Sequence, residues 1–323
     1  MKEWIIKEND AGQRLDKFLQ KAAPALPKSM MYKALRTKHI KLNGKRAEIS
    51  ARLVPGDRVT LYLKDEFFAK DSRDAFMRAP AEVRVVYEDG NILLADKPSG
   101  LVVHEDERQG ADTLINRVQH YLYHKGEYDP AAEASFAPAL CNRLDRNTEG
   151  VVIVAKNAEG PRLLNQGIRD RELHKFYLCL VKGVPRPKEA TIKAFMRKDE
   201  RENKVAVFDK PVPGGKTMVT RYRVLKAKGK VSLCEVELLT GRTHQIRAHM
   251  AYIGCPLVGD GKYSDNRAER PLGFESQALS AYKLIFDFQE ECALSYLNGR
   301  VFEVKDVPFA ADAVMEKLAA AVR

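Results

Sequence analysis

An apolar run that follows a polar loop constrains this chain more than any other feature. Residues 151–155 read Val-Val-Ile-Val-Ala, and a Lys-Asn pair follows them. A short, mostly β-branched run bounded by polar residues is typical of a buried strand. The preceding loop, residues 141–150, places Asp145 between two arginines and ends in Gly150, which can turn the chain. A carboxylate in such a basic loop suits either chemistry or the binding of an anion.

The size and composition indicate an ordinary globular protein. The 323 residues are enough for about two domains, and 45% of them are hydrophobic and 31% charged. No apolar run approaches the length of about 18 residues that a membrane span needs, and residues 1–10 lack the features of a signal peptide. The 5 cysteines are scattered and form no CxxC pair, which predicts reduced thiols and a cytoplasmic protein.

The positive charge is concentrated near the N-terminus. Residues 11–63 contain twelve Lys or Arg and three acids, which gives +9 of the total net charge of +11. This asymmetry predicts a polyanion-binding module attached to a nearly neutral body. A merely solvated lysine face is the alternative, but the density of charge favours a surface that follows phosphates.

Local patterns predict a compact N-terminal module. Apolar spacing predicts a helix over 11–23, and Ser29 is expected to cap a second helix that ends near Leu35. Asn43-Gly44 is a strong hairpin signal, and residues 58–63 alternate like a strand. Two basic helices followed by a small sheet are therefore expected.

This arrangement resembles the alpha-L RNA-binding motif. The matching stretches are Arg14-Leu15-Asp16-Lys17-Phe18-Leu19, Ile40-Lys41-Leu42-Asn43-Gly44 and Val54-Pro55-Gly56-Asp57. The resemblance implies RNA binding by basic residues of the module, for which the candidates are Arg14, Lys17, Lys33, Arg36, Lys38, Lys41, Lys45 and Arg46. Residues 65–82 lack periodicity and are expected to be a linker. The expected domains are thus 1–64 and 83–323.

The larger domain is expected to have an α+β fold with a mixed, mainly antiparallel sheet. Strands are predicted at 83–87, 91–97, 151–156, 174–181, 220–225 and 231–239, and helices at 113–123 and 157–171. Residues 124–137 are interpreted as a loop, and residues 185–219 as a polar stretch with a turn at Gly214-Gly215.

A second polar constellation, residues 240–250, begins directly after a predicted strand. Thr240 or Thr243 is expected to cap a helix whose first turn favours an anion, with Arg247 on the same face as Thr243. His244 and His249 are five residues apart and lack the HExxH pattern, so no zinc site is expected.

These residues together resemble the RluA family of RNA pseudouridine synthases. Residues 142–150 are similar to its catalytic-loop motif, usually His-Arg-Leu-Asp-Arg-Asp-Thr-Ser-Gly, and Lys175-Phe176-Tyr177 matches its Lys-x-Tyr motif. Residues 241–249 and 254–260 match its C-terminal motif, and residues 96–101 match the opening of its catalytic domain. The departures are Asn142, Asn147 and Glu149 in the loop, and Ser280-Ala281 where Leu-His-Ala is typical.

The resemblance implies the fold of that family and the isomerisation of uridine to pseudouridine in structured RNA, most of all large-subunit ribosomal RNA. It implies no cofactor and no metal, and a monomer is expected. The catalytic residues would be Asp145 as nucleophile or base, Arg247 paired with it, and Tyr177 stacked on the base. The candidates for substrate binding are Arg143, Arg146, Arg242, Thr243, His244 and Gln245. A catalytically silent RNA-binding or ribosome-assembly factor on the same fold is the alternative.

Overall fold

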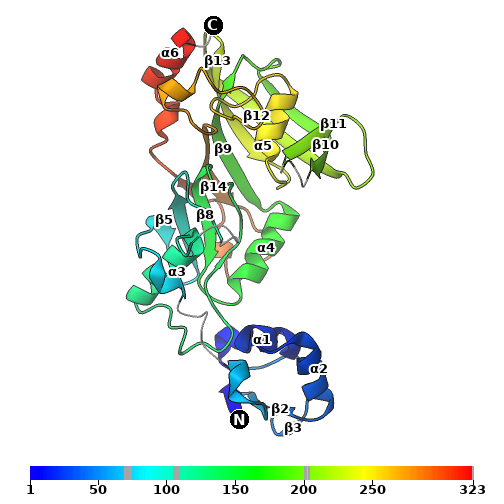
Figure 1. The fold of residues 1–323 in the computed structure, drawn as a ribbon. Helices are drawn as coiled ribbons and strands as arrows, with labels where there is room; N and C mark the ends of the chain where they lie inside the picture. The colour runs from blue at the N-terminus through cyan, green and yellow to red at the C-terminus, as the bar shows by residue number, and fades with distance from the viewer. Residues whose placement is uncertain (69–74, 105–109, 200–201, 203, 322–323) are drawn as a thin grey trace.

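The structure is a computed structural model that describes residues 1–68, 75–104, 110–199, 202 and 204–321. A small N-terminal body lies at one end of a long twisted sheet, and the C-terminal helix α6 (Asp312–Ala321) lies toward the other end (Figure 1). None of the helices in the described ranges combines the length and the apolar composition needed to cross a membrane.

The N-terminal body contains the predicted pair of helices and the predicted hairpin. Its elements are α1 (Leu15–Ala22), α2 (Lys28–Arg36), β1 (Lys2–Ile5), β2 (Ile40–Leu42), β3 (Lys45–Arg46) and β4 (Arg58–Leu61). The strands form a sheet in the order β1-β4-β2-β3. Leu15, Phe18 and Leu19 are fully buried on the inner face of α1, as the helical spacing predicts.

The turn and the helix start in this body have clear physical causes. Asn43 and Gly44 have φ values of 51° and 75°, so both adopt the left-handed conformation that a two-residue hairpin requires. The prediction that Ser29 caps α2 is wrong, because the helix already begins at Lys28 and Pro27 holds the N-cap position. The proline ring presets a φ of −58° at this position, without a capping hydrogen bond from a side chain.

The large sheet confirms the predicted α+β, mainly antiparallel architecture. Its principal strand order is β11-β10-β12-β13-β9-β14-β8-β6-β5, and among the described strands only β8 and β14 pair in parallel. The strands are β5 (Arg84–Glu88), β6 (Ile92–Lys97), β7 (Ala139–Leu140), β8 (Glu149–Ala155), β9 (Leu173–Lys182), β10 (Glu189–Asp199), β11 (Lys204–Phe208), β12 (Lys216–Lys228), β13 (Val231–Leu238), β14 (Leu279–Phe286) and β15 (Val301–Glu303). The remaining helices are α3 (Leu114–His124), α4 (Gly160–Asp170) and α5 (Gln245–Tyr252).

The turn predicted at Gly214-Gly215 is present, but the polar stretch 185–219 also contains strands that were not predicted. They are β10, β11 and the start of β12, which lie at one edge of the sheet. Only Ala194, Met196 and Val205 of β10 and β11 are buried, so much of this hairpin faces solvent. Because β10 has five charged residues among its eleven, it lacks a continuous apolar run that would mark it as a strand.

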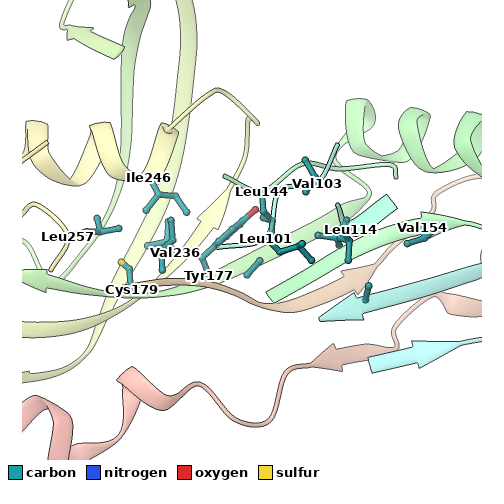
Figure 2. Close-up of a cluster of buried hydrophobic side chains, with 14 of the residues drawn as sticks. Leu101, Val103, Leu114, Leu144, Val154, Tyr177, Cys179, Val236, Ile246 and Leu257 are labelled. Atoms are coloured by element: carbon teal, nitrogen blue, oxygen red, sulfur yellow. The ribbon is translucent and has the colours of Figure 1, made fainter. Parts of the chain in front are cut away.

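The apolar run 151–155 is buried on both faces of the sheet. Val152 and Val154 join the core cluster under α3 and α5, part of which Figure 2 shows with Val154. Val151 and Ile153 join the cluster on the opposite face. A strand covered on both faces needs apolar side chains at every position, which explains the continuous run.

The expected linker packs at both of its described ends. Phe67 and Phe68 lie in a 3-10 helix (Asp65–Phe68) and pack against the core of the N-terminal body. Phe76 lies in a second 3-10 helix (Ala75–Arg78) and is buried against His120 and Tyr128. Residues 69–74, the middle of the expected linker, lie outside the described residues.

Candidate active site

Asp145 lies in the loop between β7 and β8, and both sides of that loop are anchored in apolar cores. Leu144 is buried in the cluster under α5, and Cys141 in the cluster on the opposite face. The backbone N–H of Thr148 donates to the carbonyl of Asp145 at 3.0 Å, which closes a turn. The Asp145 side chain remains 30% exposed at the surface of this turn.

A buried ammonium group fastens this loop to the end of β6. Lys97 is 0% exposed, and its Nζ donates to the carbonyls of Pro98, Leu101 and Arg146 at 2.8–2.9 Å. Burial lowers the pKa of Lys97 to about 8, although the negative charge of Asp145 acts in the opposite direction. Lys97 is therefore still mainly charged near neutral pH, and it anchors the loop that carries Asp145.

The residues after Lys97 add two further bonds to the same loop. Ser99 Oγ donates to the Asn147 carbonyl at 3.1 Å, and the Gly100 N–H donates to the Arg146 carbonyl at 3.0 Å. Residues 96–101 match a family motif, but the match alone implied no role for them. The two hydrogen bonds show that this segment supports the loop that carries Asp145.

The far end of the loop is held by a close approach of two backbones. Gly150 has a φ of 107°, and a Cβ at this position would lie 2.3 Å from the Ala281 carbonyl oxygen. Only glycine fits such a position. Two departures from the family pattern, Glu149 and Ser280, lie opposite each other in the adjoining parallel pair.

Another departure, Asn142, fastens the start of the loop to β8. Its Oδ1 accepts from the Ile153 N–H at 2.7 Å, and its Nδ2 donates to the Val151 carbonyl at 3.4 Å. The amide thus makes both a donor and an acceptor bond with the strand backbone. The substitution leaves the loop well attached at this point.

Arg247, in the first turn of α5, links Asp145 to a second carboxylate. Its Nη1 donates to Asp145 Oδ2 at 3.1 Å, while its Nε and Nη2 donate to the two oxygens of Asp260 at 2.7 and 2.8 Å. The Asp260 side chain is 1% exposed and that of Arg247 is 9% exposed. Asp260 ends the segment 254–260 that matches the family motif, and no local signal in the sequence predicts its bidentate contact with Arg247.

The charge on Arg247 is secured by these partners. Burial acts to lower the pKa of the guanidinium, but the hydrogen bonds and charges of Asp260 and Asp145 raise it above its usual value. A bidentate bond to Asp260 also fixes the plane of the guanidinium. Arg247 is thus a rigid cation that meets Asp145 from one side.

Tyr177 enters the site from β9, and its hydroxyl end points toward Leu144 and Leu101 (Figure 2). The side chain is buried with 5% exposure. Burial, together with the negative charge of Asp145, raises the pKa of its phenol. Tyr177 is therefore a neutral ring next to the carboxylate.

His244 and Tyr263 border Asp145 on the side of α5. His244 Nε2 lies 3.9 Å from Asp145 Oδ2, and its Nδ1 lies 3.0 Å from the Tyr263 hydroxyl. Burial lowers the pKa of His244, against the opposing charge of Asp145, so the ring is mainly neutral near pH 7. The Tyr263 hydroxyl also accepts from the Val205 N–H of β11 at 2.9 Å, which ties the edge hairpin to this corner.

Gln245 is buried, and neighbouring groups occupy its amide. Its Oε1 accepts from Thr240 Oγ1 at 2.8 Å and from the Arg242 N–H at 3.0 Å. Its Nε2 donates to the Val219 carbonyl and to Thr220 Oγ1. The structure therefore places Gln245 behind the surface of the site.

The prediction that Thr240 or Thr243 caps α5 is wrong. His244 takes the N-cap position with a φ of 52°, without a capping bond from its side chain. Thr240 Oγ1 instead accepts from the Val219 N–H of β12 at 2.9 Å. The Gln245 amide organises the turn in place of a hydroxyl cap.

The other predicted substrate residues lie at the surface around Asp145. Arg143, Arg146, Arg242 and Thr243 are exposed, and Arg242 Nε donates to the Thr217 carbonyl at 3.2 Å. Within the described parts of the chain, no group of three or more His, Cys, Asp and Glu side chains could hold a metal ion.

The predicted RNA-binding residues lie on the N-terminal body and not beside Asp145. Lys17, Lys33, Arg36, Lys38, Lys45 and Arg46 are exposed, and Lys41 is half-buried with its Nζ 5.2 Å from the ring centroid of Tyr62. Arg14 makes a two-pronged ion pair with Asp16, at 3.0 and 3.1 Å. Most of the basic side chains thus face solvent.

Comparison with known proteins places the chain in a family and identifies its N-terminal domain. The family profile described as RNA pseudouridylate synthase matches residues 91–252, and the S4 domain profile matches residues 13–59. The solved structure of human RNA pseudouridylate synthase domain containing 4 covers 78% of this chain and 95% of its own, with a TM-score of 0.56 and 23% identity. That likeness shows a shared fold.

Relatives with higher identity span most of the chain. Ribosomal large subunit pseudouridine synthase C of Vibrio cholerae serotype O1 is 34% identical over 289 residues, which cover 87% of each chain. Its Escherichia coli (strain K12) counterpart is 33% identical over 276 residues, covering 83% of this chain and 81% of the relative. The chain therefore belongs to the RNA pseudouridylate synthase family and carries an S4 domain near its N-terminus.

Proposed function

We propose that this chain isomerises specific uridines to pseudouridine in large-subunit ribosomal RNA. One observation carries the proposal: Asp145 is partly exposed, and Arg247 holds it while Asp260 occupies the other nitrogens of the same guanidinium. The similar enzymes of Vibrio cholerae and Escherichia coli, both named ribosomal large subunit pseudouridine synthase C, support the choice of RNA.

The reaction needs one carboxylate that stays charged and in place. The bond between N1 of uracil and C1′ of ribose breaks, the base rotates, and a new bond forms between C5 and C1′. The hydrogen on C5 is lost as a proton, and N1 gains one. Asp145 serves as the nucleophile that attacks the sugar or base, or as the base that removes a sugar proton. Both routes use the ionised carboxylate that Arg247 stabilises.

The burial or exposure of the other site residues indicates their roles toward the substrate. Tyr177 lies against the uracil ring as a neutral phenol, because its raised pKa opposes release of the hydroxyl proton. Arg143 is exposed and fills the space that the flipped uridine leaves, which offsets part of an unstacking cost of a few kcal/mol. Arg146, Arg242, Thr243 and His244 bind the RNA backbone near the flipped base.

Gln245 acts on the substrate indirectly. Because neighbouring groups of β12 and of the turn occupy both ends of its amide, it positions Arg242 and the start of α5. This assignment differs from the direct contact that the sequence motif implied. It predicts that a change at Gln245 disturbs the placement of Arg247 two residues later.

Two units share the task. Residues 1–64 bind RNA through their basic surface, and residues 83–323 carry out the isomerisation. Residues 65–82 connect these two units. The protein acts in the cytoplasm as a monomer and needs no cofactor or metal.

Mapping of pseudouridine tests the function directly. Large-subunit ribosomal RNA from cells with the gene, without it, and with an Asp145→Asn copy is compared. The expected result is a uridine that is modified only when the unaltered gene is present. Asp312→Asn, which changes an exposed carboxylate on α6, is the matched control and should preserve the modification. Identical maps in all strains would instead support the catalytically silent RNA-binding factor.

A further inference from the structure

The loop after α3 carries a docking contact for the N-terminal body. We call residues 129–135 of this loop the docking loop. Asp10 of the N-terminal body is fully buried, and its Oδ1 accepts from both the N–H and the hydroxyl of Ser135, at 2.9 and 2.6 Å. A buried carboxylate needs such donors, and both of these come from the other body.

Further contacts spread over the rest of the docking loop. Gln13 Nε2 donates to Ser135 Oγ at 2.8 Å, and Lys7 Nζ donates to the Ala132 carbonyl at 2.8 Å. Ala134 packs against the apolar core of the N-terminal body. The contact therefore combines hydrogen bonds, a buried charge and apolar packing, which together resist rotation of one body on the other.

The docking contact and the basic surface are separate parts of the N-terminal body. In the described residues, no hydrogen bond or ion pair joins the docking loop to Lys33, Arg36 or Lys45, and all three side chains face solvent. The body can thus bind RNA while it remains docked. In Figure 1 it lies beyond α3 and α4, away from the edge formed by β10 and β11.

We propose that the docking loop fixes the orientation of the N-terminal body relative to Asp145 and thereby selects the target uridine. The proposal rests on the proposed function, because it assumes that the body binds the same RNA that Asp145 modifies. A fixed spacing between a phosphate-binding surface and a reaction site admits only those uridines that lie at the matching distance in the folded RNA. Ser135 and Asp10 are positioning residues in this scheme.

The gain in affinity from two linked contacts depends on geometry. An RNA that reaches both surfaces at once binds through an effective concentration set by the spacing, and that gain is lost when the spacing becomes variable. Loosening the docking contact should therefore reduce kcat/KM for long RNA by about tenfold or more. A short stem–loop that reaches only the Asp145 site should react at an unchanged rate.

A distance measurement on the full chain tests the fixed orientation without any RNA. Spin labels are attached at Ser29→Cys on α2 and Arg162→Cys on α4, both exposed positions, after Cys292→Ser removes the partly exposed native thiol. Double electron–electron resonance should give one narrow distribution of distances between the two labels. Asp10→Ala or Ser135→Ala should broaden it, whereas Ser135→Thr, which keeps the hydroxyl, and Glu48→Ala, an exposed carboxylate of the same body, should not.

The second arm measures selection. RNA carrying the mapped uridine is offered both as the full large-subunit transcript and as a short stem–loop. The Ser135→Ala variant is informative even if Asp10→Ala unfolds the N-terminal body, because Ser135 lies outside that body. Narrow distances or an unchanged ratio of the two kcat/KM values in Ser135→Ala would overturn the inference, as would a broad distribution in the parent chain. If neither the parent chain nor any variant forms pseudouridine, the proposed function fails. The distance measurement then still tests whether the docking loop fixes the orientation of the N-terminal body.

Discussion

Lys97→Met is the perturbation that most directly tests how the loop that carries Asp145 is held. The ammonium group of Lys97 is buried below the loop, where three carbonyl groups accept its hydrogen bonds. Methionine has a similar length and no charge, so it fills the space and removes all three bonds. We expect a large fall in kcat, a smaller change in KM and a loss of a few kcal/mol in the free energy of unfolding.

The magnitudes follow from two opposing effects. Burial moves the pKa of Lys97 from 10.5 to about 8, so keeping the buried group charged costs about 3 kcal/mol. Three hydrogen bonds from a charged donor contribute about 1.5–3 kcal/mol each. Because Lys97→Met removes both effects, the net loss of stability is about 1.5–6 kcal/mol. A displacement of Asp145 by about 1 Å lowers kcat by about 100-fold.

The dependence on pH gives this prediction a second signature. The folded chain binds fewer protons at Lys97 than the unfolded chain between about pH 8 and 10.5, so this residue raises the free energy of unfolding as pH increases across that window. A neutral amine has only two N–H groups for three carbonyls, so the loop loosens and kcat falls above about pH 8. Both dependences should vanish in Lys97→Met.

The assay is a single-turnover reaction with RNA whose uridines carry tritium at C5, because the new bond at C5 releases that hydrogen. Lys156→Met is the matched control, since Lys156 is also nearly buried but bonds to Glu88 and Asp89 at the far end of β8. The Lys156→Met variant should have a lower free energy of unfolding and an unchanged rate of tritium release per folded molecule. A Lys97→Met rate equal to that of the parent chain, or an unchanged pH profile, would refute the role of Lys97.

Three further predictions address the rest of the fold around the site. Asp260→Asn should lower both kcat and the free energy of unfolding, the latter by about 3–5 kcal/mol in urea titrations, because Arg247 is left buried without its main counter-charge. Burial lowers the pKa of His249 to about 4 from 6.5, so acidification from pH 6.5 to 4 should remove about 3 kcal/mol of stability, and His249→Leu should abolish that part of the slope in urea titrations at each pH. Gly150→Ala should lower the free energy of unfolding by at least about 2 kcal/mol, measured by thermal unfolding, because the added Cβ meets the Ala281 carbonyl. An unchanged melting temperature would contradict the close approach.

Features encoded locally were predictable from the sequence. The run 151–155 identified β8 because both faces of that strand are buried, and Asn43-Gly44 identified the hairpin because both residues accept a positive φ. In each case the residues that form the structure are contiguous, so their pattern alone carries the information. The family resemblance added Asp145, Tyr177 and Arg247 as a set.

Features that depend on distant partners have no local signal, and the pairing of Arg247 with Asp145 was predicted from the family resemblance alone. Arg247 and Asp145 are 102 positions apart, and Ser135 and Asp10 are 125 positions apart. Nothing local distinguishes Lys97 from a surface lysine, because its acceptors are carbonyl groups brought together by the fold. The start of α5 was misassigned for a related reason, since the Gln245 amide replaces a threonine cap only once β12 is in place.

The contacts of Asp145 show why its loop is held from several directions. Arg247 and His244 both approach Oδ2, and no hydrogen bond reaches Oδ1 from the described part of the chain. One oxygen is therefore held, and in the proposed function the other is the one that meets the substrate. Because Asp260 accepts hydrogen bonds from two further nitrogens of Arg247, the position of the guanidinium does not depend on Asp145 alone. A loop anchored by Lys97 and by the backbone contact at Gly150 can then keep Asp145 still while the detached uracil rotates, which is the one large movement that the isomerisation requires.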